Sequence, residues 1–98
     1  MAYEATTTHE MDASIDALRE SKDRLVSLSI AERISLLEQI IEGTHAVADS
    51  WLERALEAKG LSTDSPYAGE ELLAGPMCVY RNARFLIRSL KEIEKHGK

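Results

Sequence analysis

The chain has 98 residues, 44% of them hydrophobic and only 5% aromatic, and a formal net charge of −5. This length suits one domain or part of a larger one, and the apolar share excludes a compositionally disordered chain. The acidity disfavours binding to nucleic acid or to an anionic membrane, and no apolar run approaches the length of a membrane span. A single cysteine, Cys78, excludes an internal disulfide framework and fits a reducing cytoplasm, where we expect the protein to reside.

The N-terminal ten residues show no hydrophobic period, and they lack the basic and apolar regions of a secretory signal. We expect a disordered tail over residues 1–10. A first helix is predicted from about 11 to 25, because apolar residues recur at helical spacing: Met11, Ile15, Leu18 and Leu25.

The strongest helix signal covers residues 29–59. Ser29 and Glu32 form a capping box, in which each side chain satisfies a backbone N–H of the first turn. Gly60 supplies the expected stop, and Gly43 is the weak point of the interior. The apolar stripe that follows the cap consists of Ile30, Ile34, Leu37, Ile41, Ala48, Leu52 and Ala55.

Turn-forming residues occupy 61–68, where Ser65 and Pro66 fit the cap and first position of a short helix that ends before Gly75-Pro76. A long helix is then predicted from about 77 to 95, and Gly97 is its expected end. The apolar face predicted for this helix consists of Val79, Ala83, Leu86, Leu90 and Ile93.

These elements predict an all-α fold for residues 11–98, with three main helices. Short connections favour antiparallel neighbours, so the second and third main helices are expected to form a long antiparallel hairpin.

No complete catalytic, cofactor-binding or metal site is predicted. Glycines are too dispersed to hold a phosphate, and the one E-x-x-H pair, Glu42 and His45, lacks the further ligands of a carboxylate metal site. We interpret Cys78 as an ordinary small helical residue, and the neighbours Asp49 and Ser50 do not create a hydrolytic triad.

The charges are distributed unevenly. Residues 80–98 carry a net charge of +4, which leaves −9 on the remainder. Five basic residues share one predicted helix face, and they indicate either a solvated face or a docking face for another domain, subunit or anionic partner: Arg81, Arg84, Arg88, Lys91 and Lys95. A matching acidic row in the long helix consists of Glu38, Glu42, Asp49 and Glu53, and rows of opposite charge set pairing and register.

Three segments together resemble a known family. They are the AERISLL run over 31–37, the WLERALEAKG run over 51–60 and the SPYAGEELLAGP run over 65–76. Nearly the whole chain, about 12–95, resembles the N-terminal helical segment of the aldehyde dehydrogenase superfamily, particularly a larger bacterial branch.

The resemblance implies a parent enzyme that oxidises aldehydes with NAD(P). Its catalytic cysteine, glutamate base and Rossmann cofactor domain would lie downstream, and none of them maps onto a residue of this chain. The leading hypothesis is therefore a structural, catalytically inactive part of a dehydrogenase-like protein whose partner is the remainder of that enzyme. The alternative is an independent helical module that associates with another copy of itself. Under either hypothesis we expect a homo-oligomer.

Overall fold

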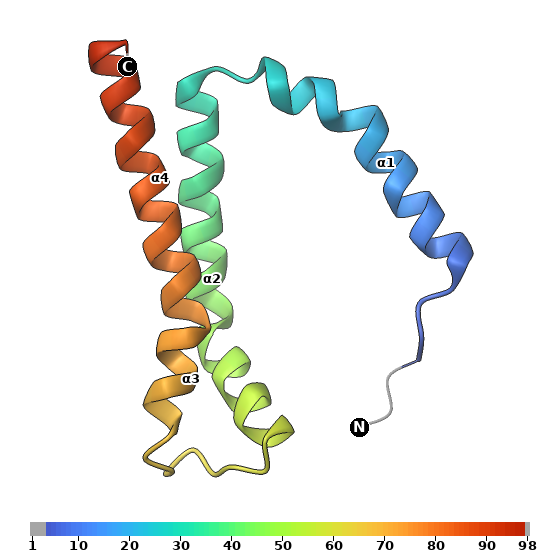
Figure 1. Ribbon diagram of the computed structural model, residues 1–98, viewed down its shortest axis with the longest axis vertical. Coiled ribbons are helices and arrows are strands. Elements are labelled where there is room, and N and C mark those ends of the chain that lie inside the picture. Colours follow the sequence, from blue (N-terminus) through green and yellow to red (C-terminus); the bar gives the residue numbers. More distant parts are fainter. Residues whose placement is uncertain (1–3, 98) are drawn as a thin grey trace.

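The computed structural model describes residues 4–97, which form four helices. They are α1 (Thr8–Ser27), α2 (Ile30–Ala58), α3 (Ala68–Ala74) and α4 (Pro76–His96). Figure 1 shows α2 and α4 running antiparallel side by side, with the short α3 leading into α4. The predicted all-α class, the three main helices, the short helix before Gly75-Pro76 and the antiparallel hairpin are all confirmed.

The core lies between α2 and α4. Each residue of the predicted α2 stripe is buried or half-buried, and Ile34 and Leu56 are the most enclosed large side chains of this helix. On α4 the small side chain of Ala83 is buried, which allows the two helices to approach closely. A two-helix core of this size leaves many large apolar side chains exposed.

The packed side of α4 differs from the predicted one at two positions. Ile87 is half-buried together with Val79 and Leu90, whereas Leu86 and Ile93 are exposed. Successive helical residues point about 100° apart, so a helix that directs Ile87 at α2 turns Leu86 to the neighbouring edge. The prediction that Leu86 and Ile93 belong to the packed face is wrong for this reason.

The first helix begins earlier than predicted. The Thr7 side chain accepts a hydrogen bond from the Glu10 backbone N–H, and the Glu10 carboxylate accepts one from the Thr7 N–H, which makes a second capping box. Residues 8–10 are therefore helical, and the predicted disordered tail over 1–10 is too long. Residues 1–3 lie outside the described part of the chain.

Turn chemistry at the C-terminal end of α2 follows the prediction. Gly60 has a φ of 67°, and the N–H groups of Gly60 and Leu61 donate to the carbonyls of Glu57 and Leu56, which is a Schellman motif. The predicted cap of the short helix is wrong. Ser65 Oγ accepts from the Tyr67 N–H in a turn, and α3 begins at Ala68 without a side-chain cap.

The long helix α2 is continuous through Gly43. Figure 1 shows its axis changing direction over its C-terminal part, drawn in yellow-green. Two hydroxyls in this helix donate to carbonyls of the preceding turn, Thr44 to Ile40 at 2.7 Å and Ser50 to Val47 at 3.0 Å. Such bonds bend helices.

The first helix stands apart from the rest. Within residues 4–97, α1 packs against none of the other three helices and has no buried residue. Figure 1 shows it leaving the top of α2 on the side away from α4. The predicted first helix is present as α1, but the core is formed by the other helices. No helix in this part of the chain is long and apolar enough to cross a membrane.

The close contact at Gly75 gives a test of the packing. A Cβ at this position would lie 2.9 Å from the Glu71 carbonyl oxygen and 3.2 Å from Trp51 Nε1. We expect Gly75→Ala to lower the free energy of unfolding by about 1–3 kcal/mol, because overpacking forces side chains and backbone to shift.

The matched control is Gly69→Ala in α3, where a Cβ would meet nothing within 4 Å. This change should leave stability unchanged or raise it by up to ~1 kcal/mol, because alanine favours helix over glycine. Urea unfolding followed by circular dichroism measures both. Equal effects of the two substitutions would contradict the packing described at Gly75.

Candidate docking faces

The elbow between α1 and α2 is held by one side chain. Arg33 Nε donates to the Leu28 carbonyl at 3.1 Å, and Arg33 Nη2 donates to the Val26 carbonyl at 2.7 Å. Both carbonyls lie where α1 ends and lack helical partners there. A charged guanidinium is a strong donor, so Arg33 joins the first turn of α2 to the end of α1. The connection itself consists only of Leu28 and Ser29.

A groove of about 530 Å³ lies in the angle of this elbow. Its apolar lining comes from Leu25, Leu28 and Leu36. The polar lining is Ser21, Arg24, Glu32, Ser35 and Gln39. The groove is open, and it carries no cluster of groups suited to catalysis.

Exposed apolar side chains continue from this groove along three helices. We define the apolar face as four residues of α1, four of α2 and two of α4, each between 39% and 69% exposed. They are Met11, Ile15, Leu18, Leu25, Leu36, Ile40, Val47, Trp51, Leu86 and Ile93.

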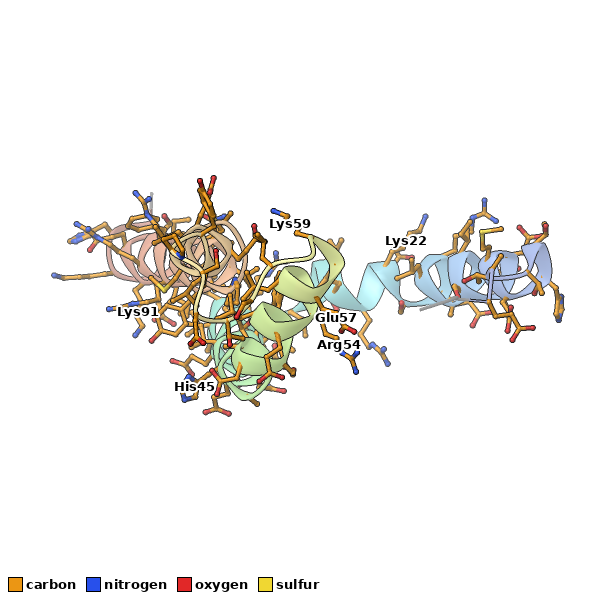
Figure 2. All side chains as sticks on the ribbon, turned by 90° about the horizontal axis from the view of Figure 1, so that it is seen from below. Lys22, His45, Arg54, Glu57, Lys59 and Lys91 are labelled. Carbon is orange, nitrogen blue, oxygen red and sulfur yellow. The ribbon has the colours of Figure 1, made fainter. Side chains whose placement is uncertain are left out.

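The α2 and α4 parts of this face lie on one side of the molecule. Figure 2 shows His45 and Lys91 pointing to one side. Residues two positions apart in a helix point about 200° apart, so Val47 and Ile93 point to the other side.

Helix α1 presents its apolar stripe to that same side. Figure 2 shows Lys22 on the side opposite His45. Lys22 lies four residues after Leu18 and three before Leu25, so it shares their stripe. The molecule measures 48 × 37 × 18 Å, so the apolar face lies on one broad side of a thin, open plate in which α1 diverges from the hairpin (Figure 1).

The predicted docking residues lie along the outer edge of α4 and, at Lys91, on the side opposite the apolar face. All five basic residues of α4, from Arg81 to Lys95, are exposed. Arg81 lies over the Phe85 ring at 5.3 Å and Arg84 over the Tyr80 ring at 5.8 Å, which are cation–π distances. A groove brings Glu38 of the acidic row beside Arg84, Arg88 and Lys91.

The two charged rows do not pair within the chain. Among residues 4–97, none of the ion pairs joins α2 to α4. One pair links α2 to α3, where Lys59 donates to Glu71 and the hydrogen bond raises the pKa of Lys59. The basic row is thus available to an external partner, and whether it binds one stays a prediction.

The side chains with catalytic or metal-binding chemistry do not come together in the structure. Cys78 is exposed, and its thiol donates to the Leu73 carbonyl at 3.1 Å. Glu42 and His45 are both exposed on α2, and Ser50 Oγ donates to its own helix. No group of three or more metal-ligating side chains occurs in the described residues.

Comparison of the chain with protein-family models, with curated proteins and with solved structures finds no match. The resemblance to aldehyde dehydrogenases therefore stays a prediction based on the sequence.

The α2 part of the apolar face was not identified in the sequence. These residues are spaced three to four positions apart when Gly43 is counted as a member of the stripe: Leu36, Ile40, Val47 and Trp51. This second stripe lies about 100° from the one that packs on α4. On a helical wheel this segment shows two apolar stripes, and that pattern indicates a helix with contacts on two sides.

The capping box at the elbow predicts a pH dependence. The Ser29 hydroxyl donates to the Glu32 carboxylate at 2.7 Å and the Ser29 N–H at 2.8 Å. These bonds, the hydroxyl first, hold the pKa of Glu32 below its ordinary value of 4.5. The stabilisation is complete above 4.5 and is lost as the pH falls through the lowered pKa.

We expect an NMR titration of the Glu32 carboxyl to show a midpoint below 4.5, and Ser29→Ala to return it towards 4.5. Helical signal at the start of α2 should fall over the same pH interval. A midpoint that does not move in Ser29→Ala would contradict the capping geometry.

Proposed function

We propose that this chain is a structural, non-catalytic helical segment that docks through its apolar face, and that its partner is the remainder of an aldehyde dehydrogenase-like oxidoreductase. The broad apolar face is the observation that carries the first part. Ten large apolar side chains on one side of the molecule are each 39–69% exposed, and exposed apolar surface of this extent marks interaction surfaces.

The second part rests on the sequence resemblance, and the structure adds a role for one of its residues. Arg33, which opens the long helix in the AERISLL run, fixes the direction of α1 by bonding to Val26 and Leu28. In the parent enzyme the apolar face would cover the dinucleotide-binding domain, and the basic row would fix the orientation. NAD(P) would bind to that domain and not to these helices.

The chain alone should not oxidise aldehydes. We expect the purified 98-residue protein to give no NAD(P)-dependent aldehyde oxidation and no tight binding of either nucleotide. Turnover or tight binding by these residues alone would refute the assignment of the active site to another part of the enzyme.

The positive test uses the gene. Its reading frame, or a gene beside it, should encode a Rossmann domain and a dehydrogenase-type catalytic cysteine. When that product is made with this segment, Val47→Asp should reduce the yield of soluble active enzyme, because it places a charge on the docking face. His45→Asp, on the opposite side of α2, should not. A gene neighbourhood without any dehydrogenase sequence would contradict the proposal.

A second candidate function is an independent self-associating module. The observation that favours it is α1, a helix of 20 residues that carries an apolar stripe and touches no other helix of its own chain.

A further inference from the structure

The apolar stripe of α1 has no counterpart within its own chain. The stripe points to the same side of the plate as the α2 stripe, so the two lie beside each other and do not face each other. To bring them into contact, α1 would have to turn about its own axis and cross over α2. The two hydrogen bonds from Arg33 oppose that movement at the elbow.

The edge of α2 that α1 does border is polar. In the elbow groove the α2 residues are Glu32, Ser35, Leu36 and Gln39, of which only Leu36 is apolar. Closing α1 onto this edge would bury a carboxylate and an amide against Leu18 and Leu25, which costs free energy. The open arrangement of α1 is therefore consistent with the residues beside it.

With a second copy of the chain, α1 does not have to turn about its own axis, and the polar edge of α2 does not have to be buried. When two copies face each other across a two-fold axis that runs parallel to the hairpin in the plane between them, the unpartnered α1 of each comes over the hairpin of the other. The α1 stripe from Met11 to Leu25 is about 21 Å long, and the α2 stripe from Leu36 to Trp51 is about 22 Å long, at 1.5 Å per residue. The stripes match in length.

A stable interface needs about 800 Å² from each partner. Ten large side chains, each 39–69% exposed and spread over three helices, supply an apolar contact of that order.

We propose that two copies of this chain pair through their apolar faces, with α1 of each copy lying on the α2 stripe of the other. This deepens the second candidate function, the self-associating module, and rests on it, but it does not rest on the dehydrogenase proposal. It describes the free chain, and the remainder of an enzyme would compete for the same face. Lys22 lies within the α1 stripe, where a charged residue limits the affinity.

Trp51 provides a native reporter, because it is the single tryptophan of the chain and belongs to the α2 stripe. We expect its emission to shift to shorter wavelength as protein concentration rises, together with a doubling of mass in light scattering. Leu18→Asp should abolish both changes, although Leu18 lies on a different helix. Lys22→Leu should tighten the dimer about tenfold, because it completes the stripe with an apolar side chain.

The matched pair of variants is Val47→Asp and His45→Asp, which change exposed residues on opposite sides of α2. Val47→Asp should raise the dimer Kd by about tenfold or more. His45→Asp should leave it unchanged, because His45 points away from the apolar face. Circular dichroism confirms that each variant keeps its helices.

Three results would overturn the proposal. The wild type and Lys22→Leu could both remain monomeric at all concentrations. His45→Asp could weaken association as much as Val47→Asp. A Trp51 signal that responds to Leu18→Asp but not to concentration would show that α1 closes onto its own chain. A failure of these tests leaves the dehydrogenase proposal standing, because the gene neighbourhood decides that proposal separately.

Discussion

The packing of α2 on α4 is the constraint on which the rest of this structure depends. A pair of helices can bury only the side that each turns towards the other. Here that contact encloses Ile34, Leu56 and Ala83, and it leaves Leu36, Val47 and Leu86 on the neighbouring edges. The same contact places the charged edges of both helices on the opposite side. One helix pair thus determines which side of the molecule is apolar and which is charged.

Local interactions then fix the remaining elements around that pair. Lys59 and Glu71 join the end of α2 to α3, and Gly75 lets the chain pass close to the Trp51 ring before Pro76 starts α4. At the other end, Arg33 holds α1 away from the hairpin. The position of α1 is the unusual feature, because a helix with an apolar stripe normally buries it.

Much of this fold could be predicted from the sequence. Hydrophobic spacing and capping signals, such as Ser29 with Glu32 and the stop at Gly60, locate the helices to within a few residues. The errors have physical causes. Thr7 and Glu10 form a capping box ahead of the first apolar residue of the stripe, where apolar spacing gives no signal. Leu86 shares the apolar spacing of Val79 and Leu90, but Ile87 packs on α2 in its place.

The docking surface was predictable only in part. The basic row of α4 follows from the sequence, but its relation to the apolar face depends on how α2 and α4 rotate about their axes. The isolation of α1 depends on hydrogen bonds from Arg33 to backbone carbonyls, and a sequence does not display those contacts. Short connections favour antiparallel packing, yet a two-residue elbow also permits the open arrangement seen here.

We infer that α1 is unpacked within one chain and becomes packed only on a partner. Amide hydrogen exchange measured over a range of protein concentrations distinguishes these two states of α1. We expect protected amides in α2 and α4 at every concentration, and protection in α1 that appears only as the concentration rises. Strong protection of α1 in the most dilute sample would contradict it, because such protection requires a contact within the same chain.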